Sequence, residues 1–332
     1  ALTAAGRNPT GLAGGRVASW GGNARIGGRE LYVVEADEFD RAFLALAPTV
    51  AVINNVEADH LECYDGSVAV LEQAFGEFAR RARRVITGAD DPGAERVAAT
   101  LGERVVWRVG LAEGADVRIM EPTLEATGSR ARIRLPDRGE VRLALGVPGL
   151  HNLRNAAAAL AVACDLGADV AAAVEALAGF SGVGRRFERV GESGGVTVLD
   201  DYAHHPTEVA ATLAAARQAF PRRRVVAVFQ PHLFSRTALH GEALGRALAA
   251  ADVVVIAPIY AAREQPLPGV TADLVARGAI RAGAPTTAVR EREALTGELA
   301  ALVRPGDVVL TLGAGDVTRV GPELLAAIGK RR

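Results

Sequence analysis

The sequence predicts an α/β protein of two domains, with mostly parallel sheets and a Rossmann-like second domain. Its 332 residues suit two domains better than one or three. Short apolar runs with strand character alternate with longer Ala-rich runs of helical spacing along most of the chain. Polar clusters directly follow several of the apolar runs, which is typical of open α/β sheets that bind ligands at the carboxyl ends of their strands.

The composition narrows the classes of function. Hydrophobic residues make up 49% and charged residues 23% of the chain, which is enough apolar material for a sizeable core. The net charge of −1 gives no electrostatic attraction for nucleic acid or an anionic membrane surface, so we expect neither as a partner. Cys63 and Cys164 lie far apart, which argues against a disulfide framework or a thiolate zinc site and fits a cytoplasmic location.

The first half of the chain alternates between predicted strands and helices. Ala1 to Gly6 predicts the end of a helix with a glycine cap, and 11–28 predicts a glycine-rich loop. Apolar runs at 31–34 and 50–53 predict buried strands. The same alternation predicts helices at 67–84 and 92–101 and strands at 85–88 and 105–109.

Two clusters of acidic residues follow the first two predicted strands. Residues 35–40 contain four carboxylates, and residues 54–60 contain two carboxylates and a histidine. Carboxylates at such spacing repel one another unless a cation lies among them. A solvated turn explains either cluster alone, but two clusters after consecutive strands favour a metal or metal–nucleotide site.

The pattern changes between 115 and 166. A period of two at 117–119, 131–135 and 141–145 predicts a small antiparallel patch on the edge of a mostly parallel sheet. A long Ala-rich helix follows and ends near Leu166. His151, Asn152 and Asn155 crowd its first turn, where an N-cap explains one Asn and recognition of a base edge explains Asn155.

The second half contains the densest polar cluster, at 199–208, between a short apolar run and an Ala-rich run. It holds three acids, a tyrosine and two histidines, which exceeds what a polar loop with a capping box requires. The Arg185–Arg186 pair just before it is either solvated or a phosphate clamp. Apolar runs that end in polar residues predict the strands of the Rossmann-like domain at 196–199, 225–229, 253–256 and 308–312.

Six motifs in order along the chain resemble the Mur ligases, and among them the members that add L-alanine to UDP-N-acetylmuramate. The resemblance covers essentially the whole chain, and the motifs His-His-Pro-Thr-Glu and Gln-Pro-His are its most specific parts. The residues that carry it are 35–40, 55–60, 151–156, 184–188, 200–208 and 229–232.

The resemblance implies a fold and a reaction. Mur ligases have a UDP-binding domain, a central ATPase domain and a C-terminal Rossmann-like domain. ATP phosphorylates the lactyl carboxylate of UDP-N-acetylmuramate, and the amine of L-alanine then attacks the acyl phosphate, a step of peptidoglycan precursor synthesis for the cell wall. The implied cofactors are ATP and Mg²⁺, because magnesium must screen the anions that meet in the phosphoryl transfer.

The resemblance also implies roles for individual residues. Glu35 and His60 would be magnesium ligands, supported by Glu38, Asn55 and Asp59. The nucleotide would be bound by His151, Asn152, Asn155, Arg186 and Asp201. Tyr202, His204, His232 and Arg236 would surround the substrates, and the last three are the candidate catalytic residues. A neutral histidine would accept the amine proton, and Arg236 would stabilise charge; which histidine acts is left open.

Two departures from the family pattern stand out. The family's phosphate-binding loop and UDP-binding domain are absent from this sequence, so we expect 1–184 to form an N-terminally incomplete ATP-binding domain and 185–332 the C-terminal domain. We therefore expect the chain alone to be inactive without an N-terminal segment, and to be a monomer or weak homodimer. The second departure is Leu233, where many relatives carry arginine.

Three other functions remain open at this point. A ligase that reattaches recycled murein tripeptide shares the architecture, although Thr207, Glu208 and Phe187 favour the alanine-adding enzyme. A metal-dependent hydrolase could use the same acids and histidines. A non-catalytic nucleotide-binding remnant is the third.

Overall fold

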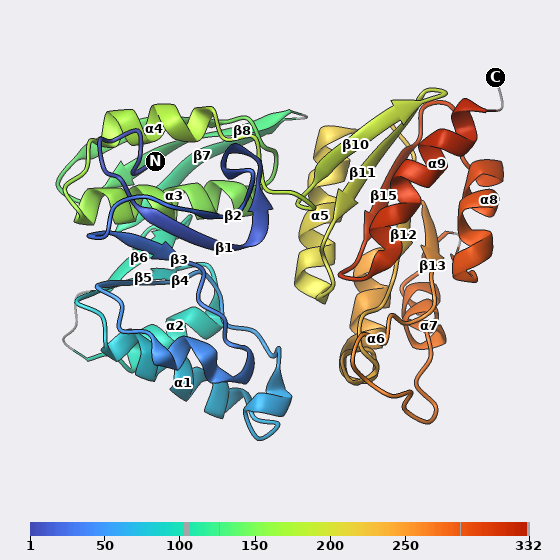
Figure 1. Cartoon of the computed structure of the whole chain (residues 1–332), viewed down its shortest axis with the longest axis horizontal. Coiled ribbons are helices and arrows are strands. Elements are labelled where there is room, and N and C mark those ends of the chain that lie inside the picture. Colours follow the sequence, from blue (N-terminus) through green and yellow to red (C-terminus); the bar gives the residue numbers. More distant parts are fainter. Residues whose placement is uncertain (103–105, 126, 286, 331–332) are drawn as a thin grey trace. The chain divides into compact units, whose positions relative to one another are not determined.

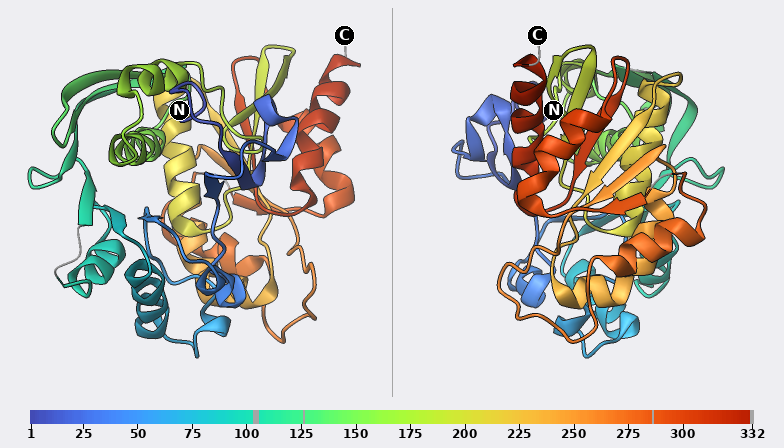
Figure 2. Two further views of the ribbon diagram at one scale, coloured as in Figure 1. Left: turned by 60° about the vertical axis from the view of Figure 1, so that its left-hand side comes forward. Right: turned by 90° about the vertical axis from the view of Figure 1, so that its right-hand side faces the viewer.

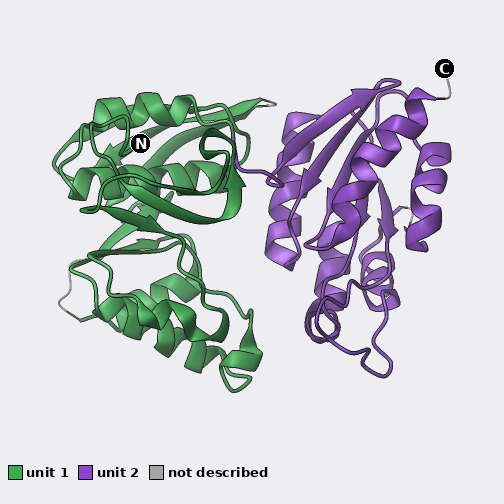
Figure 3. Cartoon of the chain, in the orientation of Figure 1, with its two compact units in different colours: residues 1–181 green, residues 182–332 purple. Residues whose placement is uncertain are grey.

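The computed structural model describes residues 1–102, 106–125, 127–285 and 287–330. The chain divides into two compact units, Ala1–Ser181 and Gly182–Arg332 (Figure 3). This division falls a few residues before the predicted boundary between 1–184 and 185–332. Within the described residues, each unit contains a six-stranded sheet. The same part of the chain contains no helix that is both long and apolar enough to cross a membrane.

The large sheet of the first unit confirms the predicted mixture of parallel and antiparallel strands. Its first four strands in spatial order are parallel, and β8 and β9 are added antiparallel at one edge. Val105, the first residue of the strand predicted at 105–109, lies outside the described residues. The spatial order is β4 (Val50–Ile53), β5 (Arg84–Gly88), β6 (Val106–Gly110), β7 (Val117–Glu125), β8 (Gly128–Leu135) and β9 (Gly139–Leu145).

Helices cover both faces of this sheet (Figure 1). Ile86 of β5 packs with α3 (Leu150–Asp165) and α4 (Val170–Ala178), whereas its neighbour Val85 packs with α1 (Val68–Arg80) and α2 (Pro92–Ala99). Adjacent strand residues point to opposite faces, so a continuous apolar run is what a doubly covered strand needs.

Residues 11–28 were predicted to be a loop, and this prediction is wrong. They form β1 (Thr10–Val17), a 3₁₀ turn (Ala18–Trp20) and β2 (Gly22–Arg25), which join β3 (Tyr32–Val34) in a small separate sheet of order β2-β1-β3. Gly11 is required there, because a Cβ at this position would lie 2.6 Å from the Trp20 ring. Glycine in a strand often marks such a close approach rather than a loop.

The strand predicted at 31–34 is present as β3, but it is not buried as expected. Tyr32, Val33 and Val34 are all exposed although successive side chains point to opposite faces, so neither face of this edge strand is fully covered by the described residues. At the start of the chain, the predicted helix end is a single turn: the N–H of Arg7 donates to the carbonyl of Leu2, and Gly6 has φ 76°.

The second unit confirms the Rossmann-like prediction. Five of its strands are parallel among the described residues, and β10 (Glu188–Ser193) is antiparallel at one edge. From β10 the order continues with β11 (Val196–Asp201), β15 (Val308–Leu312), β12 (Val225–Phe229), β13 (Val253–Ile256) and β14 (Thr287–Val289).

Two groups of helices enclose this sheet (Figure 1; Figure 2, right). Ala227 of β12 faces the first group, and its neighbours Val226 and Val228 face the second. The first group is α5 (Pro206–Ala219), α6 (Phe234–Leu248) and α7 (Asp273–Arg281), and the second is α8 (Arg292–Leu302) and α9 (Val320–Gly329).

The strand register brings four carboxyl ends to one edge of the sheet. Asp201 of β11 pairs with Leu312 of β15, which also pairs with Phe229 of β12, and Phe229 pairs with Ile256 of β13. The polar segments that follow these residues therefore begin side by side.

Candidate active site

Aromatic and imidazole rings form a continuous row at this edge of the second unit. The rings of Tyr202 and His204 meet edge to face with centroids 5.2 Å apart, and His204 and His232 lie 6.2 Å apart. His232 stacks on Tyr260, with centroids 5.8 Å apart and planes 14° from parallel. The structure thus brings together three predicted site residues and adds Tyr260, which sequence reasoning had given no role although it follows a predicted strand.

The orientation of His204 is set by hydrogen bonds. Its Nδ1 lies 2.9 Å from the carbonyl oxygen of Tyr202, so the neutral ring carries its proton on Nδ1. The Glu208 carboxylate lies 3.3 Å from the same nitrogen and accepts the backbone N–H groups of His204 and His205. Burial alone would raise the pKa of Glu208, but the charge of His204, these N–H groups and Arg186 hold it below its ordinary value.

His232 is kept neutral by its surroundings. Burial, followed by the positive charges of Arg236, His204 and Arg263, lowers the pKa of His232 to about 4. Arg236 on α6 is itself 8% exposed, so this charge is held inside the protein. The neutral imidazole has a free electron pair for hydrogen bonding or proton acceptance, the adjacent cation disfavours its protonated form, and the arginine can stabilise negative charge.

The two adjacent arginines have different environments. Arg185 binds the buried Asp200 through Nε at 3.1 Å and donates to the carbonyl of Gly313 at 2.6 Å, which ties it to the sheet. Arg186 is half exposed and contacts Glu208 at 3.3 Å, with its guanidinium 5.4 Å from the Tyr202 ring. Arg186 therefore retains the exposure that an anion ligand needs, whereas Arg185 is structural.

Asp201 is buried at the end of β11. Its two oxygens accept the backbone N–H groups of Phe187 and Ala203, both at 2.8 Å. Burial nevertheless raises the pKa of Asp201 to about 6, with the N–H groups and Arg186 opposing the shift.

This raised pKa predicts a pH dependence of stability. The folded state binds the extra proton between pH 3.8 and about 6, so the contribution of Asp201 is complete below 3.8 and is lost as pH rises through about 6. Relative to Asp201→Asn, we expect the wild type to lose about 2 kcal/mol of unfolding free energy between pH 4 and 7. Urea unfolding followed by circular dichroism measures this, and a pH-independent difference would contradict it.

Gln230 holds the Gln-Pro-His segment, residues 230–232, in place through two hydrogen bonds. Gln230 is buried, donates to Asp316 at 2.8 Å and accepts the N–H of Val317 at 3.0 Å. Leu233, at the departure from the family pattern, is also buried and has a left-handed φ of 65°. Leu233 thus packs inward, and Arg236 and Arg263 supply positive charge near His232.

In the first unit, the predicted metal ligands have different neighbours. Glu35 accepts the N–H of Gly14 at 2.7 Å. The Nε2 atom of His60 lies 3.9 Å from carboxylate oxygens of both Glu38 and Asp59, and its Nδ1 lies 3.6 Å from Glu62. Glu35 follows β3 and His60 follows β4, which are consecutive along the chain as expected, although the two strands belong to different sheets.

The acidic surroundings of His60 favour a cation. Burial raises the pKa of Glu38, and the charges of Asp37 and Asp59 add to the shift while His60 opposes it. His60 is a non-glycine residue with φ 53°, a strained conformation that often occurs at functional sites. Among the described residues, no three His, Cys, Asp or Glu side chains are arranged to hold a metal by themselves.

The first turn of α3 carries the three residues predicted to bind nucleotide. Gly149, with φ 102°, is the N-cap rather than an asparagine, and a Cβ on it would lie 2.6 Å from the His151 ring. Asn152 donates to the carbonyl of Pro148 at 2.7 Å, which stabilises the turn. Asn155 is exposed one turn further along, so its carboxamide is accessible to a ligand.

Comparisons with known proteins match a different family domain in each of the two compact units. The Mur ligase middle domain matches residues 23–163, and the Mur ligase, glutamate ligase domain matches residues 185–315. A UDP-N-acetylmuramate–L-alanine ligase of Thermobifida fusca is 45% identical over 98% of this chain and 70% of its own length.

This chain belongs to the Mur ligase family.

Solved structures of Mur ligases share its fold. The UDP-N-acetylmuramate–alanine ligase of Thermotoga maritima matches with a TM-score of 0.80 at 27% identity, over 100% of this chain and 71% of that one. The MurF ligase of Thermotoga maritima in complex with ADP matches with a TM-score of 0.71 at 22% identity, over 98% of this chain and 75% of that one. At 22% identity, the second match supports the fold alone.

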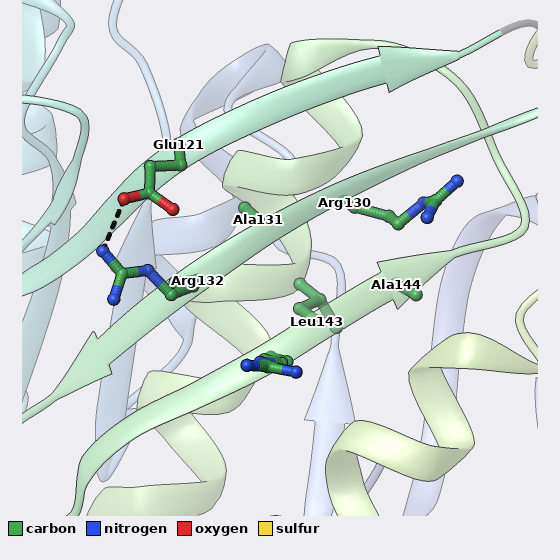
Figure 4. A pocket seen from close by; sticks show the side chains of 7 residues that line it. Glu121, Arg130, Ala131, Arg132, Leu143 and Ala144 are labelled. Atoms are coloured by element: carbon green, nitrogen blue, oxygen red, sulfur yellow. Dashed lines mark hydrogen bonds and ion pairs between the residues drawn. The ribbon is translucent and has the colours of Figure 1, made fainter.

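A surface hollow in the first unit of this Mur ligase is lined by none of the candidate residues. It occupies about 360 Å³ on β7, β8 and β9 (Figure 4). Arg132 there is paired with Glu121 at 2.6 Å and with Glu140 at 3.1 Å. Glu121 and Glu140 therefore neutralise Arg132, one of the three arginines that line the hollow.

Proposed function

We propose that this chain forms the ATP-binding and C-terminal parts of a ligase that joins L-alanine to the lactyl carboxylate of UDP-N-acetylmuramate. The observation that carries the proposal is the 45% identity, over nearly the whole chain, to a relative with that name. The cluster of Tyr202, His204 and His232 at the strand edge supports a location for the proposed chemistry.

The reaction has two steps. The carboxylate attacks the γ-phosphorus of ATP, which gives an acyl phosphate and ADP. The amine of L-alanine then attacks the acyl carbon, so that a C–N bond forms, the C–O bond to phosphate breaks, and the amine loses a proton. Consumption of ATP fits the predicted cytoplasmic location.

The second unit supplies the groups for the amide-forming step. His204 and His232 are both candidates for accepting the amine proton; the low pKa of His232 keeps that ring neutral but also disfavours its protonated form. The buried Arg236 would stabilise the oxyanion formed when the amine attacks. Tyr202 would form a wall for the substrates beside His204.

Residues of both units are proposed to bind ATP. Asn155 would bind adenine, and His151 and Asn152 would shape the pocket around it. Arg186 would bind phosphate through its half-exposed guanidinium, and Asp201 would serve the ribose or the domain junction. The ADP bound by a Mur ligase of the same fold supports nucleotide use in this family.

The donor atoms near His60 fit Mg²⁺ in their chemistry. Magnesium in phosphoryl-transfer sites uses one or two carboxylates together with substrate phosphates, so three protein ligands are not required. Glu35 and His60 would hold the ion, with Glu38 and Asp59 adding negative charge beside His60. When bound, the ion would neutralise charge on the transferring phosphoryl group.

His60 predicts a measurable effect on metal binding. With Mn²⁺ as the probe and ATP present, we expect His60→Ala to weaken Mn²⁺ binding at least about tenfold, because a ligand is lost. Electron paramagnetic resonance of free Mn²⁺ measures the change. Glu113→Gln is the matched control, since Glu113 is an exposed acid of the same unit that pairs with Arg118. Equal affinities of His60→Ala and wild type would exclude His60 as a ligand.

The reaction is tested by phosphate release from ATP with Mg²⁺, UDP-N-acetylmuramate and L-alanine, omitting each in turn. The chain is assayed alone and joined to the part of the Thermobifida fusca relative that it does not cover. Release that requires all components supports the ligase, and a requirement for murein tripeptide in place of L-alanine indicates the recycling ligase. Metal-dependent hydrolysis without ATP, or nucleotide binding without turnover in both forms, would overturn the proposal.

A further inference from the structure

The two histidines of the active site are held in different ways. His204 has a hydrogen-bonding partner at Nδ1, the carbonyl oxygen of Tyr202. The Nδ1 atom of His232 is buried and makes no hydrogen bond within the part of the chain that the structure describes. A catalytic histidine usually depends on such a bond for its orientation. The orientation of His232 must therefore come from packing.

Tyr260 supplies that packing. Its backbone N–H donates to the carbonyl of Pro231 at 2.8 Å, and its carbonyl accepts the N–H of Leu233 at 2.9 Å. The backbone of Tyr260 is therefore hydrogen-bonded to both sequence neighbours of His232. The two rings stack at 5.8 Å. Gly315 leaves space for the tyrosine, because a Cβ there would lie 2.7 Å from Tyr260 Cγ.

A second set of hydrogen bonds holds the segment after Tyr260 in place. Glu264 accepts both the backbone N–H of Ser235, at 2.9 Å, and the Ser235 hydroxyl, at the start of α6. Between the two attachments, Ala262 has φ 49°, a conformation that a non-glycine residue keeps only when its surroundings impose it. Residues 260–264 are therefore held by hydrogen bonds at both ends beside residues 231–235.

We infer that Tyr260 is a positioning residue, whose ring holds the His232 imidazole in the one orientation used in the proposed ligase reaction; the inference rests on that proposed function. The tyrosine ring stacks on His232, and Tyr260 is 38% exposed, so it is also accessible to solvent. Stacking needs the aromatic ring and not the hydroxyl, which makes phenylalanine a conservative replacement.

The test follows the His232 imidazole by NMR in the full chain, as wild type, Tyr260→Phe, Tyr260→Leu and Tyr260→Ala. The groups that face this ring are His204, Arg236, Arg263 and Glu264, and none of them is changed. We expect the His232 signals to titrate near pH 4 in the wild type and Tyr260→Phe. In Tyr260→Leu and Tyr260→Ala they should move toward 6.5, because the ring becomes solvated and reorients.

Leu267→Ala is the matched control, because it removes an exposed apolar side chain from the same connection between β13 and α7. Its His232 titration should equal that of the wild type. Tyr260→Leu keeps apolar volume, so it remains informative if Tyr260→Ala does not fold. Unchanged His232 signals in a folded Tyr260→Leu, or altered signals in Tyr260→Phe, would overturn the inference.

Activity gives an independent second measurement. If the ligase reaction is observed, Tyr260→Leu should lower kcat about tenfold or more while the KM for ATP stays the same, and Tyr260→Phe should retain activity. Absence of any reaction would count against the proposed function, whereas the NMR titration decides the positioning role separately.

Discussion

Replacing Arg236 with alanine should reduce kcat of the alanine-adding reaction by about a hundredfold or more, with little change in the KM for ATP. A buried, preorganised cation contributes most where negative charge develops, and removal of one such donor typically has an effect of this size. The same substitution should raise the pKa of His232, because the charge of Arg236 contributes to lowering it. Phosphate release and NMR titration of His232 measure the two effects.

Two further variants test whether the loss of activity is specific to the Arg236 guanidinium. Arg236→Lys keeps the charge but not the planar guanidinium, so we expect partial activity and a His232 pKa that stays low. Arg246→Ala removes a cation from the last turn of the same helix, and we expect near wild-type kinetics. Full activity of a folded Arg236→Ala variant would show that the cation does not stabilise the reacting charge.

Replacing Asp200 with alanine should have the largest effect on stability. Asp200 is 2% exposed and accepts hydrogen bonds from Arg185, from Thr311 and, at 2.9 Å, from Thr318. Removing one partner of a buried pair leaves the other uncompensated, which typically costs 3–5 kcal/mol. Because Arg185 retains 27% exposure, we expect a loss of about 2–4 kcal/mol in unfolding free energy, measured by urea unfolding.

Two further variants test whether loss of the buried charge network lowers the free energy of unfolding. Asp200→Asn keeps one acceptor oxygen but loses the charge and the second acceptor, and should fall between wild type and Asp200→Ala. Glu242→Gln removes an acid from the exposed pair with Arg281, and should change stability by less than about 0.5 kcal/mol. If Asp200→Ala and Glu242→Gln are equally mild, the buried network does not hold the Arg185 turn in place.

Prediction from sequence succeeded best where local pattern and burial agree. The strands at 225–229, 253–256 and 308–312 have the bounds that the apolar runs predict, because every residue in them is buried by helices on both faces. It failed at β1 and β2, where glycines such as Gly11, which lies against the Trp20 ring, resemble those of a loop. Helix bounds were less accurate, as α1 ends at Arg80 rather than at Arg84.

The sequence by itself determined the α/β class, the Rossmann-like second unit and the polar residues that follow its strands, because hydrophobic period and chain order are local properties. Only the tertiary structure decided that Arg185 is structural while Arg186 is exposed, that β3 and β4 lie in different sheets, and that Tyr260 stacks on His232. Each of these depends on which distant segment packs beside a residue, and that information is absent from local spacing.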